Sequence, residues 1–203
     1  MAATESFYAV IHGRQSVREF SGEAVDAAAV ERVLQAACRA PSAHNRQPWK
    51  FVILTDVGRR TLLAEAMTSR LRRDRAADGD SAEAIEADAQ QARRRLTEAP
   101  VAVIVCLTPE SMDRYPDDRR QRAEWTMMVQ SVAMAGENLL LAAHVEGLAA
   151  CWMCAPLFAP EEVREALSLP EEWEPQGMVL LGHPRAAPPR RPRRAVGEVT
   201  RWL

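Results

Sequence analysis

The longest predicted helix places the strongest constraint on the fold, because it has too little polar surface to stand alone in water. It spans residues 124–145 and is apolar around most of its circumference. A helix of this kind must be buried on nearly all sides. In a chain of 203 residues this burial indicates help from a second subunit. The alternative is a central helix of a monomer.

Apolar runs predict the strands of a sheet. Residues 100–107 are apolar on both faces and therefore predict a central strand, and residues 51–54 and 177–182 predict two more buried strands. Asp26 and Asp56 are suitable N-caps for helices over residues 26–39 and 58–71. Further helices are expected over residues 4–12, 82–96 and 161–167.

The composition sets limits on the class of protein. A hydrophobic share of 47% against 27% charged residues is typical of a globular chain, and we expect one domain over residues 1–203. The net charge of -2 provides no electrostatic footprint for nucleic acid, and no apolar run reaches the roughly 18 residues that a membrane span needs. Residues 1–7 lack the pattern of a secretory signal, so we expect a cytoplasmic protein.

Two stretches have the chemistry of a ligand site. In an extended segment over residues 14–20, Arg14, Ser16 and Arg18 share one face, which suits a phosphate; a solvated basic edge is the alternative. In residues 40–49, two prolines are expected to hold the loop extended while Trp49 anchors it by burial. Three side chains of this loop can bond a planar heterocycle: Ser42, Asn45 and Gln47. An ordinary helix-to-strand connection is the alternative.

The sequence contains no recognisable protein nucleophile or metal site. Cys151 and Cys154 have CxxC spacing, but no second pair accompanies them, and the four histidines show no ligand or triad spacing. A cofactor is therefore expected to carry any chemistry.

The charged stretch over residues 70–98 is predicted to be a surface excursion or lid that selects the substrate. Its arginines, of which Arg70 is the first, would favour an anionic acceptor, and Tyr115 in a later loop could stack on it. The alternatives are a solvated charged helix and a tyrosine that covers the edge of the core.

Four motifs in order, at residues 14–20, 40–49, 147–148 and 182–184, resemble the FMN-dependent nitroreductase family. Within it, residues 115–117, 151–153 and 169–175 are most similar to the flavin domain fused to the ligase of deazaflavin-coenzyme biosynthesis. The resemblance implies an α+β fold with a mixed central sheet flanked by helices, and an intertwined homodimer with FMN at its interface.

The resemblance also implies the roles of individual residues. The phosphate and ribityl chain would be held by Arg14, Gln15, Ser16, Arg191 and Arg193. The ring would lie near Met153, Cys154 and Ala155, and the other subunit would line it with Pro41, Ser42 and Asn45.

The implied activity is hydride transfer from NADH or NADPH through FMN to an electron-poor small molecule such as a nitroaromatic or a quinone. One alternative is a reductase or binding module for a deazaflavin coenzyme or its precursor. Another is a flavin-binding protein that is not an enzyme.

Overall fold

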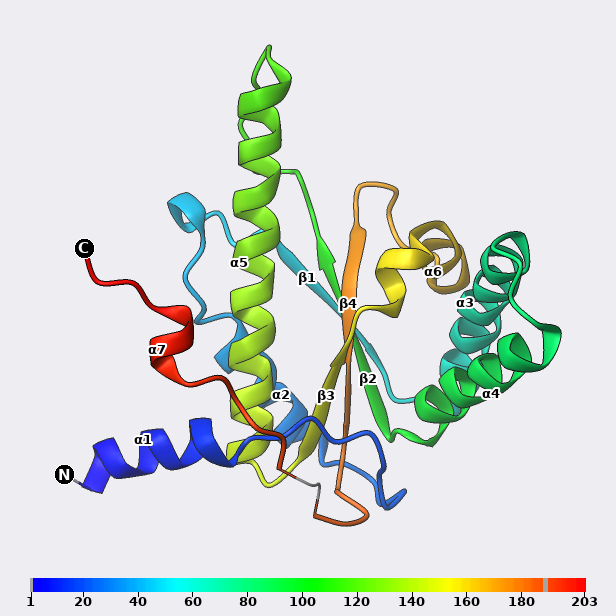
Figure 1. The fold of residues 1–203 in the computed structure, drawn as a ribbon, viewed down its shortest axis with the longest axis horizontal. Coiled ribbons are helices and arrows are strands. Elements are labelled where there is room, and N and C mark those ends of the chain that lie inside the picture. Colours follow the sequence, from blue (N-terminus) through cyan, green and yellow to red (C-terminus); the bar gives the residue numbers. More distant parts are fainter. Residues whose placement is uncertain (1, 188–189) are drawn as a thin grey trace.

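The computed structural model describes residues 2–187 and 190–203 (Figure 1). The α+β class is confirmed, and every predicted helix and strand is present. In chain order the elements are α1 (Ala2–Gly13), α2 (Ala27–Ala37), η1 (Ala43–Asn45), β1 (Trp49–Leu54), α3 (Val57–Ala77), α4 (Ala82–Glu98), β2 (Val101–Leu107), α5 (Asp118–Val145), β3 (Ala149–Met153), η2 (Ala155–Phe158), α6 (Pro160–Leu167), β4 (Glu174–Gly182) and α7 (Val196–Val199). In these described ranges, no helix is both long and apolar enough to cross a membrane.

The sheet has the strand order β1-β2-β4-β3, and each pair of neighbouring strands is antiparallel. Within the described part of the chain, parallel pairing is confined to one isolated bridge between Ser16 and Ala150. There the Val17 amide donates to the Ala150 carbonyl at 2.9 Å. The parallel component of the predicted mixed sheet is therefore a single bridge that fastens residues 14–20 to the free edge of β3.

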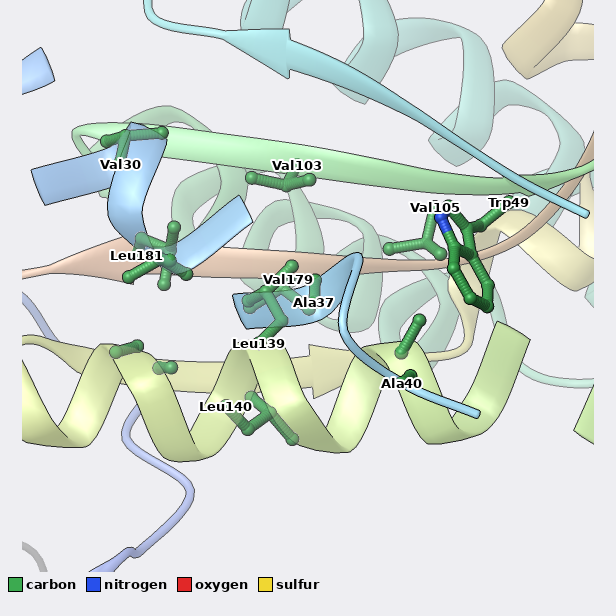
Figure 2. Packing of buried hydrophobic residues seen from close by; sticks show 14 of the residues in the cluster. Val30, Ala37, Ala40, Trp49, Val103, Val105, Leu139, Leu140, Val179 and Leu181 are labelled. Atoms are coloured by element: carbon green, nitrogen blue, oxygen red, sulfur yellow. The ribbon is translucent and has the colours of Figure 1, made fainter. Parts of the chain in front are cut away.

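The core lies on both sides of the sheet, because β2 and β4 bury alternate side chains on opposite faces. Val103, Val105 and Leu181 face α2 and α5, as Figure 2 shows for their packing against residues such as Leu139. Ile104 and its alternate neighbours face the opposite layer, which contains α3, α4 and α6 (Figure 1). The prediction that residues 100–107 form a central strand is confirmed.

Helix α5 differs from its prediction in where it begins and in how it is covered. It starts at Asp118 instead of residue 124, because the Asp117 carboxylate accepts from the Arg120 amide at 2.9 Å and caps the helix. The first turns are polar, so they carry no apolar periodicity to detect. Within this chain α5 buries one stripe, which includes Met128 and Leu139, whereas Met134 stays exposed. The predicted burial on nearly all sides is not achieved by one chain alone.

Trp152 is held between α5 and β4 by two glycines. A methyl group on Gly136 would lie 2.5 Å from the indole Cζ3 atom, and one on Gly177 would overlap the Cζ2 atom. Only glycine, whose side chain is a single hydrogen atom, leaves room for the indole ring at these two positions. The indole Nε1 then donates to the Cys154 sulfur at 3.3 Å, so the wedged ring also holds the turn that follows β3.

We expect Gly177→Ala to lower the free energy of unfolding by about 1–3 kcal/mol, since overpacking of a close contact forces side chains or backbone to shift. Urea denaturation followed by circular dichroism measures this change. Gly197→Ala is the matched control, because among the described residues no atom other than its chain neighbours and its own helix backbone lies within 4 Å of a methyl group there. An equal effect of both substitutions would show that Trp152 can move aside.

Candidate functional site

A polar cavity of about 870 Å³ lies where three separate segments of the chain meet. They are the extended residues 15–19, the last turns of α4, and a tail segment that contributes Arg185, Arg191 and Arg193. The first segment is held at both ends, by the bridge from Ser16 to Ala150 and by another from Phe20 to Pro184. The lining residues are Gln15, Ser16, Arg18, Glu19, Gln91, Arg94, Arg95, Glu98, Arg185, Arg191 and Arg193.

The cavity is strongly basic, because six of its residues are arginines and two are glutamates. Arg185 Nη2 lies 3.8 Å from Glu98 Oε2. Among the side chains that the structure describes, no carboxylate lies within ion-pair distance of the other five arginines of the cavity. Most of its positive charge is thus available to a ligand.

Five of the six residues predicted to bind phosphate line this cavity: Gln15, Ser16, Arg18, Arg191 and Arg193. Arg14 instead lines an adjoining hollow of about 320 Å³, beside His144 and Leu148. The Arg14 amide donates to the Val10 carbonyl at 3.0 Å, so this residue continues the helical bonding of α1 and the extended segment begins after it. The prediction that residues 14, 16 and 18 share one face of an extended segment is therefore wrong for Arg14.

The Arg14 guanidinium is nevertheless incompletely satisfied. Its Nε atom is buried without a hydrogen bond among the described residues, and the Glu137 carboxylate lies 3.7 Å away. A buried donor without an acceptor is costly, so this group is suited to an acceptor from a ligand.

The arginines of α4 were missed by the sequence analysis, although a signal for them exists. Gln91, Arg94, Arg95 and Glu98 are spaced i, i+3, i+4, i+7 and form one polar stripe of α4. The opposite side of the helix buries a set of residues that includes Leu96. A helix that is apolar on one side and carries adjacent arginines on the other presents those arginines away from the core.

The loop over residues 40–49 is turned, and the prediction of an extended loop is wrong. His44, Asn45 and Gln47 have φ values of 52°, 56° and 50°. The Ser42 hydroxyl accepts from the Gln47 amide at 3.0 Å, and the Ser42 carbonyl accepts from the Asn45 amide at 3.0 Å. These local bonds close a tight turn that the proline pattern alone did not reveal.

The turned loop is fixed to its surroundings, and Trp49 is buried as predicted. The Ala43 amide donates to the Ser131 hydroxyl of α5 at 3.2 Å. Arg46 Nη2 donates to Asp113 at 2.6 Å, and this bond raises the pKa of Arg46. In this chain the loop does not line the arginine cavity, so Pro41, Ser42 and Asn45 lie apart from the predicted phosphate residues.

The predicted ring-binding residues lie at the end of β3 and the start of η2. Met153 is half-buried and Cys154 is exposed. Ala155 lines an apolar hollow of about 310 Å³ together with Met67, Arg70 and Phe158. Helix α4 separates this hollow from the arginine cavity, because Ala92 faces the first and Gln91 the second.

The charged stretch over residues 70–98 is a packed part of the fold. It forms the end of α3, a turn at Gly79 and all of α4, and it buries Ile85, Ala89 and Leu96. The prediction of a surface excursion is therefore wrong for one side of α4.

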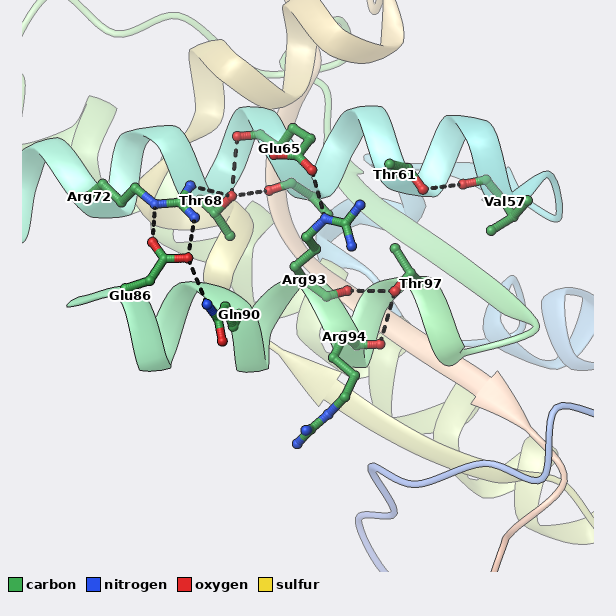
Figure 3. Close-up of polar contacts among 11 residues, drawn as sticks. Val57, Thr61, Glu65, Thr68, Arg72, Glu86, Gln90, Arg93, Arg94 and Thr97 are labelled. Carbon is green, nitrogen blue, oxygen red and sulfur yellow. Dashed lines mark hydrogen bonds and ion pairs between the residues drawn. The ribbon is translucent and has the colours of Figure 1, made fainter. Parts of the chain in front are cut away.

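The four arginines in the last turns of α3, Arg70, Arg72, Arg73 and Arg75, are already neutralised by acidic partners. Arg70 donates a hydrogen bond to Asp74, Arg72 to Glu86 and Arg75 to Asp80, and these bonds raise the pKa values of the three arginines. Figure 3 shows the pair between Arg72 and Glu86, in which Nε donates to a carboxylate oxygen at 2.9 Å.

Tyr115 lies away from the cavities just described. Its amide donates to Gln121 Oε1 at 2.9 Å, and the Arg120 guanidinium lies 5.0 Å from the centre of its ring. The ring thus covers the start of α5.

Comparison with known proteins shows the family to which this chain is similar. The profile described as Nitroreductase family matches residues 11–183. A protein of Archaeoglobus fulgidus provisionally named NADH dehydrogenase/NAD(P)H nitroreductase is 30% identical over 180 residues, which cover 87% of this chain and 84% of that protein. A 5,6-dimethylbenzimidazole synthase of Rhodospirillum rubrum is 31% identical over 189 residues, which cover 89% of this chain and 83% of that protein.

Solved structures share the fold. A provisionally named nitroreductase of Desulfovibrio desulfuricans in complex with FMN has a TM-score of 0.74 and 25% identity, and the match covers 95% of this chain and 94% of that chain. A BluB-like flavoprotein of Clostridium difficile has a TM-score of 0.83 and 23% identity, with coverage of 97% and 98%.

The four cysteines are free thiols that differ in reactivity. Cys38 and Cys154 are exposed, whereas Cys106 and Cys151 are buried. Burial raises the pKa of Cys106 to about 12 and also raises the pKa of Cys151. Among the described residues, no three His, Cys, Asp or Glu side chains gather in a way that could hold a metal.

We expect iodoacetamide at pH 8 to label Cys38 and Cys154 in the folded protein, and to label Cys106 and Cys151 only in denaturant, since the thiolate is the reactive form and needs access. Mass spectrometry of peptides locates the labels, and Cys154→Ser should remove one of them. Labelling of Cys151 in the folded protein would contradict its burial.

Proposed function

The chain belongs to the nitroreductase family, and we propose that it is an FMN-dependent oxidoreductase. It takes hydride from NADH or NADPH and delivers it to an electron-poor small molecule such as a nitroaromatic or a quinone. FMN, when bound, supplies the ring that accepts and releases hydride. The residues of this chain bind the cofactor, orient it and shape the space for the acceptor.

The observation that carries the proposal is the set of arginines that line the same cavity as Ser16 and, among the described side chains, pair with no carboxylate. A phosphate monoester offers three acceptor oxygens and a charge of about -1.5 to -2. Arg18, Arg191 and Arg193 line the same cavity as Ser16, and guanidinium groups match phosphate geometry. The donor set therefore fits the phosphate of FMN, and the related nitroreductase bound to FMN supports this choice.

The rest of the cofactor would extend toward the end of β3. There Met153, Cys154 and Ala155 would lie against the ring. Arg70 lies beside Ala155 in the apolar hollow, but because Asp74 already neutralises it, an acceptor would contact it only in competition with that carboxylate. Tyr115 remains a weaker candidate for acceptor binding, because its ring packs with Arg120.

A homodimer would complete the site with a second copy of the loop over residues 40–49. Its Pro41, Ser42 and Asn45 do not line the arginine cavity of their own chain, which leaves them available to the other subunit. Exposed apolar side chains on α1, α5 and the tail also favour association. They are Phe7, Tyr8, Ile11, Met134, Val196, Val199, Trp202 and Leu203.

We expect the folded protein to bind FMN, and Arg193→Ala to weaken binding about ten- to hundredfold, because a hydrogen bond to a charged group contributes about 1.5–3 kcal/mol. Quenching of flavin fluorescence in an equilibrium titration measures the affinity. Riboflavin, which lacks the phosphate, should bind the original protein and the variant equally weakly.

Arg201→Ala is the matched control, because this residue lies in the same tail, is exposed and does not line the cavity. It should leave FMN affinity unchanged. A well-folded preparation that ignores FMN would refute the proposed function, and loss of riboflavin binding in Arg193→Ala would refute the phosphate role of Arg193.

We also expect anaerobic addition of NADH or NADPH to bleach the 450 nm flavin absorbance of the FMN-loaded protein, and a nitroaromatic or quinone to restore it. A flavin-binding protein that is not an enzyme would stay yellow. Bleaching by a reduced deazaflavin and by neither nicotinamide would assign a different donor.

A second candidate function is that of the relative named 5,6-dimethylbenzimidazole synthase, which is 31% identical to this chain. Chromatography for this product after aerobic incubation of the reduced protein distinguishes it from acceptor reduction.

A further inference from the structure

We infer that Arg94 and Arg95 form a second phosphate-binding site beside the one proposed for FMN, and that it receives a phosphate group of the electron donor or of the acceptor. The inference rests on the proposed function, since it concerns the part of the cavity that the FMN phosphate leaves unused.

The placement of the two side chains is the first support. Arg94 and Arg95 lie on the polar stripe of α4 and line the arginine cavity. In Figure 3 Arg94 points away from α3, and no dashed line reaches its guanidinium. Its neighbour Arg93 points the other way, and its Nε donates to Glu65 of α3 at 2.7 Å. Adjacent arginines on one helix therefore serve two different surfaces.

The charge of the cavity is the second support. Six arginines and two glutamates leave a formal surplus of four positive charges. The phosphate of FMN would neutralise about two of them. Arg185 is engaged by Glu98 and donates from Nε to the Phe20 carbonyl at 3.2 Å. The uncompensated charge then falls on Arg94 and Arg95.

Pairing elsewhere on the same two helices is the third support. Arg70, Arg72 and Arg75, near the end of α3, each have a carboxylate partner, so the arginines of this neighbouring surface are neutralised within the chain. Arg94 and Arg95 have no such partner in the described chain. A cavity of about 870 Å³ is also larger than a single phosphate requires. These features match a site for a second phosphorylated molecule.

The test compares Arg94→Gln/Arg95→Gln with Arg93→Gln, a control one residue away that keeps the cavity intact. Isothermal titration calorimetry on the FMN-loaded proteins measures the affinities of NADP⁺ and NAD⁺, which differ by one phosphate, and of inorganic pyrophosphate. FMN affinity and circular dichroism are measured on each variant first.

We expect the double variant to keep its FMN affinity within about twofold. Its affinity for a second anion should fall about ten- to hundredfold, which is the effect of losing a hydrogen bond to a charged group. If NADP⁺ binds more tightly than NAD⁺ only when both arginines are present, the phosphate belongs to the donor. If both nicotinamides lose affinity equally in the double variant, the site binds the diphosphate that NAD⁺ and NADP⁺ share, and the phosphate again belongs to the donor. If both nicotinamides bind the double variant as tightly as the original protein but pyrophosphate needs both arginines, the phosphate belongs to the acceptor. Arg93→Gln should behave like the original protein in either case.

Two results would overturn the inference. One is a loss of FMN affinity in the double variant as large as in Arg193→Ala, because both arginines would then serve the FMN phosphate. The other is equal binding of all three probes to the double variant and the original protein. Failure of the proposed function is distinguishable, because a protein that ignores FMN can still be titrated with pyrophosphate.

Discussion

Burial of both faces of β2 and β4 is the constraint on which the rest of the structure depends. All seven residues of β2 are buried, and successive side chains point to opposite faces of the sheet. Two helical layers are therefore required, α2 with α5 on one face and α3, α4 and α6 on the other (Figure 1). A shift of register by one residue would exchange the contacts of every side chain in these strands.

The same constraint fixes the position of the basic cavity. Leu96 belongs to the core cluster on the α3 side of the sheet, so the end of α4 cannot move away without exposing apolar surface. On the opposite wall, bridges at Ser16 and Phe20 hold the extended segment against β3 and residue 184. The arginines thus converge from elements whose positions are set by apolar packing and backbone pairing, and not by attraction among the arginines.

Much of the fold is predictable from the sequence because its signals are local. Apolar runs and aspartate caps indicate the strands and most of the helices. The start of α5 and the turn after Ser42 were predicted wrongly for one common reason: side chains accept hydrogen bonds from nearby amides there, at Asp117 and Ser42. Such bonds determine local geometry without leaving an apolar pattern.

The site is predictable only in part, because ion pairing depends on tertiary structure. Sequence composition cannot separate Arg72 of α3, which the carboxylate of Glu86 on α4 neutralises, from Arg94, which faces a cavity. Convergence of like charges opposes folding, and an anion that binds only the folded chain offsets that repulsion and stabilises it by mass action. A cluster of six arginines held together by the core, of which only Arg185 lies within ion-pair distance of a carboxylate among the described side chains, is therefore evidence of binding function. The arginines near the end of α3 are instead explained by their own ion pairs.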